Sequence, residues 1–181
     1  MTGPVEKNYS LALFDAVNEE NEDLAEARRQ ICSVNEIISG CEGFIKLMDS
    51  PAVSSEEKLN VIKDTFDGKL SRCVYNFLCV VTEGKRWDRF DKICGEFSAL
   101  CNDKLGIAQI TVTTAFPLTE EQREKVKKKM ADIIGKNIEM SEKTDKSLMG
   151  GIVVDYGDTR MDGSIKTRLE GLKDSFSKLI S

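Results

Sequence analysis

The sequence contains no histidine, three prolines and one tryptophan among its 181 residues. Without histidine, the chain lacks both the usual general base at neutral pH and the commonest metal ligand in proteins. No apolar run approaches the roughly 20 residues that cross a bilayer, and the first ten residues lack the apolar centre of a signal peptide. We therefore expect no catalytic residues, metal or cofactor, and a chain that stays in the cytosol unless a partner holds it at a membrane.

Charge is unevenly distributed along a chain of otherwise ordinary composition. Hydrophobic residues make up 40% and charged residues 31% of the sequence, values typical of a folded globular protein. Residues 1–105 hold 13 basic and 19 acidic residues, a net charge of −6, whereas residues 106–181 hold 13 and 12, a net charge of +1. The acidic first half disfavours nucleic acid as a partner, because phosphate binding needs an excess of lysine and arginine.

The cysteines all lie before residue 106, and none of them forms a CxxC motif. They are Cys32, Cys41, Cys73, Cys79, Cys94 and Cys101. Their even number is compatible with disulfides, but predicted helical faces in a cytosolic chain favour reduced, buried thiols. Zinc is disfavoured further, because the spacing of paired zinc knuckles is missing.

Residues 1–105 contain six segments whose apolar residues recur every three or four positions, the period of an amphipathic helix. These segments are residues 5–20, 24–40, 44–48, 54–68, 70–84 and 87–105. Ser54 and Glu57 form a capping box at the start of the fourth segment, and Pro51 ends the third. The short linkers between the segments predict an antiparallel six-helix bundle over residues 1–105.

The period of the apolar residues changes after Gly106 to the two-residue repeat of a half-buried strand, over residues 108–116. Thr119 and Gln122 then form a second capping box, which opens another helix. The inward face of that helix is predicted to hold Val126, Met130, Ile133 and Ile134. A weaker strand at residues 138–140, a hairpin and a last helix complete a small α+β domain over residues 106–181, so that the chain as a whole is mainly α.

The segment from Leu148 to Leu172 combines paired glycines, a strand, a tight turn and a helix. Gly150 and Gly151 lead into a β-branched strand, whereas a phosphate-binding loop leads into a helix, so we favour a packing role for them. Ser164 is placed to cap the last helix. The apolar stripe of that helix is predicted to hold Ile165, Leu169, Leu172, Phe176 and Leu179.

The order of these features resembles the C-terminal signature of the ATP synthase delta subunit family, whose mitochondrial counterpart is the oligomycin-sensitivity-conferring protein. The residues that carry this resemblance are Gly150, Gly151, Asp162, Ser164, Arg168 and Leu169. Near the other end, the sequence YSLALF from Tyr9 to Phe14 is similar to the opening of the family's first helix, with Ser10 where alanine is commoner. The length and the order of elements match the family over essentially the whole chain.

The resemblance implies a non-catalytic stator connector of a rotary, proton-translocating ATP synthase, with no cofactor. In this family the helical bundle, residues 1–105 here, binds alpha subunits of the catalytic head. The C-terminal domain, residues 106–181 here, binds the b subunits of the peripheral stalk. Such a chain is a peripheral protein at the cytoplasmic side of the cell membrane, held there only through the complex.

The resemblance also implies a binding groove for a short amphipathic helix from the N-terminus of an alpha subunit, between the first and fifth helices of the bundle. The residues of this chain that map to the groove are Tyr9, Ala12, Leu13, Ala16, Val74, Phe77, Leu78 and Val81. Without the resemblance, the simplest interpretation of Tyr9, Leu13 and Val17 is that they belong to the core. Core and groove faces share one apolar composition, so the sequence does not separate them.

Four other interpretations remain open at this point. The lysine-rich run from Lys125 to Lys129 could meet an acidic partner, although a solvated helical face is the simpler reading. Asp155, Asp158 and Asp162 fit turn chemistry or weak cation binding better than catalysis. The whole chain could instead be a helical adaptor or regulatory subunit of another complex, or a thiol redox protein that uses its cysteines.

Overall fold

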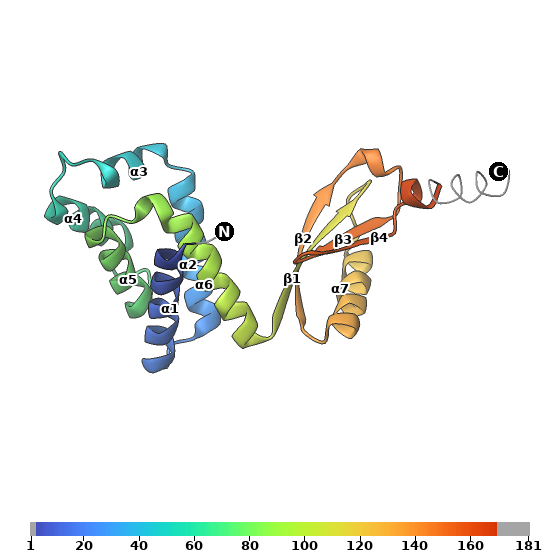
Figure 1. Cartoon of the computed structure of the whole chain (residues 1–181), viewed down its shortest axis with the longest axis horizontal. Coiled ribbons are helices and arrows are strands. Elements are labelled where there is room, and N and C mark those ends of the chain that lie inside the picture. The colour runs from blue at the N-terminus through green and yellow to red at the C-terminus, as the bar shows by residue number, and fades with distance from the viewer. Residues whose placement is uncertain (1–2, 170–181) are drawn as a thin grey trace. The chain divides into compact units, whose positions relative to one another are not determined.

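The computed structural model describes residues 3–169, and the chain divides into two compact units, Met1–Leu105 and Gly106–Ser181 (Figure 1). The first unit is helical. The second contains a four-stranded sheet with helices. The chain is therefore mainly α with a C-terminal α+β part, as the sequence predicted.

Helices make up the first unit and follow one another through short connections. Over residues 3–105 they are α1 (Pro4–Glu19), α2 (Leu24–Ser39), α3 (Glu42–Asp49), α4 (Ser55–Phe66), α5 (Arg72–Glu83), the 3-10 helix η1 (Trp87–Arg89) and α6 (Phe90–Leu105). Helix α6 packs against α1 and α2, and α5 packs against α1, α2 and α4. The largest fully buried side chains of this unit include Leu13, Ile31, Ile62, Leu78, Phe90 and Phe97.

Capping side chains fix where several of these helices begin. The predicted capping box of α4 is confirmed: the Ser54 N–H donates to the Glu57 carboxylate at 2.9 Å, and the Glu57 N–H donates to Ser54 Oγ at 3.2 Å. Asp23 accepts the backbone N–H of Ala25 at 2.9 Å and so caps α2. Lys58 is buried, and its ammonium group donates to the Ser50 carbonyl just after α3, at 2.8 Å. Polar groups that the helices leave unpaired at their ends are thereby satisfied.

The sixth helix differs from its prediction at its start. The sequence placed its first turn at Trp87, whereas the chain forms the 3-10 helix η1 there and α6 begins at Phe90. The Trp87 indole N–H donates to Thr82 Oγ1 at 3.2 Å, and its ring packs on Phe90 with centroids 4.9 Å apart. This local packing holds Trp87 in the core in a tighter turn than an α-helix provides.

The second unit is built around a four-stranded sheet in which β1 and β3 are the two central strands. Its elements up to residue 162 are β1 (Ile107–Thr114), α7 (Glu120–Ile134), β2 (Asn137–Thr144), the 3-10 helix η2 (Lys146–Leu148), β3 (Ile152–Tyr156) and β4 (Thr159–Asp162). The strand order is β2-β1-β3-β4. Strand β2 runs parallel to β1 through the α7 crossover, β3 runs antiparallel to β1, and β3 and β4 form a hairpin.

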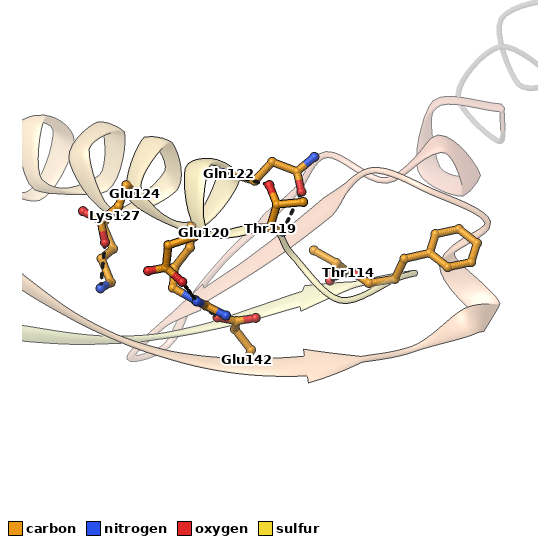
Figure 2. A network of polar contacts seen from close by, with 9 residues as sticks. Thr114, Thr119, Glu120, Gln122, Glu124, Lys127 and Glu142 are labelled. Atoms are coloured by element: carbon orange, nitrogen blue, oxygen red, sulfur yellow. Dashed lines mark hydrogen bonds and ion pairs between the residues drawn. The ribbon is translucent and has the colours of Figure 1, made fainter.

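Helix α7 covers one face of this sheet (Figure 1). Its predicted capping box is confirmed, because Thr119 and Gln122 exchange hydrogen bonds of 3.0 and 3.3 Å (Figure 2). Arg123 contacts both Glu120 on its own helix and Glu142 on β2, which ties the helix to the edge strand. Further along α7, lysines form ion pairs with glutamates one helical turn away, as the Lys127–Glu124 pair shows (Figure 2).

Two apolar residues of this unit lie where the sequence did not place them. Ile133 was predicted to face inward, but 69% of it is exposed, whereas Val126, Met130 and Ile134 do pack on the sheet. Phe116 was predicted to continue the alternation of the first strand, yet it is 71% exposed. The strand ends at Thr114, whose hydroxyl donates to the Phe116 carbonyl at 2.7 Å, so the chain turns before the alternation can continue.

One ion pair joins the start of the first unit to its last helices. Glu6, in the first turn of α1, is buried, and its carboxylate accepts a hydrogen bond from the Arg89 guanidinium at 2.9 Å. The backbone N–H of Glu6 itself and then Arg89 lower the pKa of this carboxyl group, and together they outweigh the effect of burial, which raises it. The folded chain therefore holds Glu6 in its charged form more strongly than the unfolded chain does.

We expect Glu6→Gln to reduce the acid sensitivity of the first unit. Because the pKa of Glu6 is lowered on folding, its contribution is complete at neutral pH and is lost as the pH falls below about 4.5. Urea unfolding followed by Trp87 fluorescence between pH 7 and pH 3 measures the effect. Asp15→Asn, on the same helix but exposed, controls for the loss of one negative charge. Equal pH slopes in the Glu6 variant and the unmodified chain would contradict the assignment.

Candidate functional site

An apolar groove of about 420 Å³ lies between α1 and α5, entirely within the first unit. Its lining from α1 and the cap of that helix consists of Asn8, Tyr9, Ala12, Leu13, Ala16, Glu19 and Glu20, and its lining from α5 consists of Cys73, Asn76, Phe77 and Val80. On both helices these residues recur every three or four positions, so each helix contributes one continuous stripe. The groove is an unfilled strip along two neighbouring helices.

The two helices run antiparallel along the groove, as contacts at both ends show. At one end the Cys73 thiol, in the first turn of α5, donates to the carbonyl of Ala16 near the end of α1 at 3.5 Å. Nearer the other end, the rings of Tyr9 and Phe77 meet edge to face, with centroids 6.4 Å apart and planes at 71°. Such a pair favours a fixed ring geometry and forms part of the groove floor.

The structure brings five of the eight groove residues from the sequence analysis into this lining: Tyr9, Ala12, Leu13, Ala16 and Phe77. The other three, Val74, Leu78 and Val81, are fully buried in the core of the unit at 0% exposure, so we correct their placement in the groove. They lie on the face of α5 that packs against the other helices.

Six further lining residues were not predicted from the sequence: Cys73, Asn76 and Val80 on α5, and the polar residues Asn8, Glu19 and Glu20 on α1 and its C-cap. Val80 is the clearest omission, because it is 51% exposed on an otherwise well-buried helix. Helix α5 is apolar on nearly every side, so periodicity alone does not show which stripe faces solvent. The two asparagines and two glutamates break the apolar pattern and were the signal that could have marked the groove margin.

Carboxylates gather where α1 ends and α5 begins. Glu19 is the last residue of α1, and Glu20 caps it and lies 3.7 Å from the Arg72 guanidinium. Glu22, in the loop between α1 and α2, accepts the backbone N–H of Cys73 at 3.2 Å and so caps the first turn of α5. Burial raises the pKa of Glu22, but the Ser71 side chain and the Cys73 N–H outweigh it, so the net pKa lies below its ordinary value. This end of the groove is therefore negatively charged.

The C-terminal motif forms a compact cap in the second unit. The Asp162 carboxylate accepts the Ser164 N–H and the Thr167 hydroxyl, both at 2.8 Å, and the Ser164 hydroxyl accepts the Thr167 N–H at 3.2 Å. The Ser164 N–H is the main reason why the pKa of Asp162 is lowered. Ser164 is buried, whereas Arg168 and Leu169 are exposed. Leu172, Phe176 and Leu179 lie outside the described residues.

Gly150 and Gly151 provide the close approach that this cap needs. Gly151 has φ of +87°, and a Cβ atom there would lie 2.5 Å from the Gly163 carbonyl oxygen and 2.8 Å from Ser164 Cα. The Gly150 carbonyl accepts the Ile165 N–H at 3.1 Å, next to the turn that opens the last helix. Both glycines thus pack the start of β3 against the Asp162–Ser164 turn.

The three buried cysteines do not have the properties of reactive thiols. Cys73, Cys94 and Cys101 are buried, and burial is the main cause that raises the pKa of Cys73 to about 11 and of Cys101 to about 12. Burial raises the pKa of Cys94 as well. A redox nucleophile needs the opposite shift, toward the thiolate at neutral pH. The thiol redox interpretation is therefore disfavoured for these three residues.

The described part of the chain, residues 3–169, has no group of three or more acidic or cysteine side chains placed to hold a metal ion. Within the same range, no helix has the length and apolar composition that crossing a membrane requires. The groove between α1 and α5 thus remains the main candidate for a binding site.

We expect Gly151→Ala to destabilise the second unit by about 2 kcal/mol or more, because the new methyl group meets backbone atoms that cannot move aside and the backbone has a left-handed φ. Gly157→Ala is the matched control, since Gly157 also has positive φ, of +53°, but has open space around its Cβ position. Hydrogen exchange of the β3 amides measures the loss. Trp87, in the first unit, should report unchanged unfolding. Equal exchange rates in the two variants would contradict the packing role.

We expect an aromatic disulfide reagent to modify Cys41, which is exposed, rapidly in the native chain at pH 7.5. Cys73, Cys94 and Cys101 should react only after unfolding in denaturant, since they are buried and their raised pKa leaves few thiolates. Mass spectrometry of digested, labelled protein identifies each site. Rapid native labelling at any of the three buried positions would revive the redox interpretation.

Comparisons with known proteins agree over nearly the full length. The family model described as ATP synthase delta (OSCP) subunit matches residues 5–176. The chain is 35% identical over 181 residues to the ATP synthase subunit delta of Desulforamulus reducens, covering 100% of this chain and 98% of that protein. It is 31% identical over 173 residues to the protein of the same name from Desulforudis audaxviator, covering 96% and 94%.

A solved structure also shares the fold. It is a chain in the cryo-EM structure of the Toxoplasma gondii mitochondrial ATP synthase hexamer, with a TM-score of 0.71 at 21% identity and coverage of 99% of each chain. Together with the family model and the curated relatives, these similarities identify the role as a subunit without a catalytic function of its own. The chain belongs to the ATP synthase delta (OSCP) subunit family and is a non-catalytic subunit of an ATP synthase.

Proposed function

We propose that this subunit is a stator connector that binds the catalytic head through its first unit and the peripheral stalk through its second. The groove between α1 and α5 carries the proposal, because five residues that the family resemblance assigned to head binding line one apolar strip. An apolar groove along two helices suits an amphipathic helix, which buries its apolar face there. The occupant we propose is the N-terminal helix of an alpha subunit.

The peripheral stalk would contact the second unit. Phe116 and Met149 are large apolar side chains with more than two thirds of their surface exposed, at the end of the sheet where β1 ends and β3 begins. Exposed apolar side chains near one another often mark a protein interface. The partners we propose there are the b subunits, and through them the subunit would lie at the cytoplasmic side of the cell membrane.

The proposed role is mechanical. The turning central shaft exerts a torque on the catalytic head, and the head would turn with the shaft unless an outer connection held it to the membrane stator. Such a connection needs firm binding at both ends and no chemistry of its own. Burial of apolar side chains in a preformed groove supplies binding energy at a limited entropic cost.

We expect the full-length chain to bind a synthetic peptide from the N-terminus of the alpha subunit of the same synthase, with Kd below about 1 μM, or roughly −8 kcal/mol. Val80→Asp should weaken binding at least about tenfold, because the apolar face of the peptide would desolvate the new carboxylate. Isothermal titration calorimetry measures both affinities.

Ile37→Asp is the matched control, since Ile37 is 59% exposed on α2 and does not line the groove. It should bind the peptide as the unmodified chain does. Absence of binding by the unmodified chain, or equal binding by the Val80 variant, would contradict the assignment of the groove to the catalytic head.

A further inference from the structure

Three side-chain contacts follow one another along the interface between α2 and α6. Arg28 Nη1 donates to Asn102 Oδ1 at 2.8 Å, Cys32 Sγ lies 3.5 Å from Ser98 Oγ, and Asn35 Nδ2 donates to Asp91 Oδ1 at 3.0 Å. Residue numbers rise along α2 as they fall along α6, so the two helices run antiparallel. The middle contact is made by a thiol, which therefore faces the central turns of α6.

Two further thiols flank Ser98 on the same side of α6. Cys94 precedes it by four residues and Cys101 follows it by three, and both spacings bring side chains to one face of a helix. Cys94 is 4% exposed and Cys101 is 0% exposed. Burial is the main cause that raises the pKa of both thiols, and the neighbouring Cys32 raises both further. Three thiols thus share one region between α2 and α6.

Cys101 is better placed than Cys94 to meet Cys32. From Ser98, three residues correspond to about 4.5 Å along the helix axis and four residues to about 6 Å. Helical side chains also lean toward the amino end of their own helix. Because the helices are antiparallel, Cys32 and Cys101 lean toward one another, whereas Cys94 leans away from Cys32.

We propose that Cys32 and Cys101 form an intramolecular disulfide when the chain meets hydrogen peroxide, and that this bond fastens α2 to α6. The Cys32 sulfur attacks one peroxide oxygen, the O–O bond breaks, and a sulfenic acid and one water form. The Cys101 sulfur then attacks the Cys32 sulfur, and the hydroxyl group leaves with the Cys101 proton as a second water. Two thiols thereby lose two electrons and two protons to one peroxide.

The order of these steps follows from exposure. Cys32 is only partly buried, so a molecule as small as hydrogen peroxide can reach it from solvent. Cys101 is closed to solvent, which protects it from a bulky reagent but not from a neighbour inside the fold. Its raised pKa slows its attack, and the fixed position of the sulfenic acid beside it compensates by proximity. Cys101 therefore acts second, as the thiol that captures oxidised Cys32.

Mass spectrometry of the full-length chain tests the bond. The reduced chain is treated with an excess of hydrogen peroxide, remaining thiols are blocked, and the chain is digested without reduction. Cleavage after glutamate puts Cys32, Cys94 and Cys101 on separate peptides. We expect a linked pair of peptides that contain Cys32 and Cys101, and we expect this pair to disappear on reduction.

Cys94→Ala is the matched control for Cys101→Ala, since both residues are buried on one face of α6 and both changes remove one sulfur atom. Cys94→Ala should retain the linked peptides, whereas Cys101→Ala and Cys32→Ala should lose them. Trp87 fluorescence on urea unfolding checks that each reduced variant keeps the fold of the first unit. A bond from Cys32 to Cys94, or the absence of any intramolecular bond to Cys32, would overturn the proposal.

The bond should also change the stability of the first unit. It would close a loop of about 70 residues and so restrict the unfolded chain. We expect oxidation to raise the urea midpoint reported by Trp87 by about 1 M or more in the unmodified chain, and to leave it unchanged in Cys101→Ala. Equal midpoints for the oxidised and reduced unmodified chain would show that the bond does not fasten the helices in their native arrangement.

Neither α2 nor α6 contributes to the lining of the groove between α1 and α5. The disulfide can therefore form whether or not the groove binds the catalytic head, and the peptide titration and the oxidation experiment succeed or fail separately.

Discussion

Helix α1 carries apolar residues on two adjoining faces, and the fold of this chain buries only one of these faces. Leu13 and Val17 lie in the core, where α6 packs along the helix. Ala12 and Ala16, one position before each of them, border the groove, which the buried Leu13 also lines. Burial of apolar surface drives both folding and association, so a second apolar strip that the fold leaves uncovered is available to a partner.

The small residues of this strip suit a helical occupant. Ala12 and Ala16 permit close helix approach, while Tyr9 and Phe77 present a rigid aromatic floor whose geometry is set by their edge-to-face contact. Because the floor is packed in the absence of a partner, little ordering is needed when a helix binds. Buried neighbours such as Val74 and Leu78 support the site from the core without touching its occupant.

Polar contacts between residues distant in sequence hold the groove helices in place. The Glu6–Arg89 pair fixes the first turn of α1 to the segment before α6, and Glu22 fixes the loop after α1 to the first turn of α5. Each carboxylate has a lowered pKa because its charged form is hydrogen bonded in the fold. In the second unit, hydrogen bonds of Asp162 and Ser164 fix the turn that opens the last helix.

The sequence by itself determined the elements whose signals are local. Both capping boxes, at Ser54 and Thr119, were predicted because a cap depends on residues three positions apart. The change of period after Gly106 also falls where the chain divides into its two units. The strands of the small α+β part followed from short apolar runs bounded by turns, and its helix α7 from the capping box at Thr119 and the helical period that follows it.

Only the tertiary structure decided which apolar stripe of α5 lines the groove. The core face of α5, with Val74, Leu78 and Val81, is as apolar as its groove face, with Phe77 and Val80. Neither hydropathy nor periodicity distinguishes a helix face that packs against neighbouring helices from one that the fold leaves uncovered. The exposure of Ile133 and Phe116 was hidden for a related reason, because it depends on where α7 and β1 meet the rest of the sheet. Burial is a property of three-dimensional neighbours, and a one-dimensional pattern specifies the faces of a helix but not what covers them.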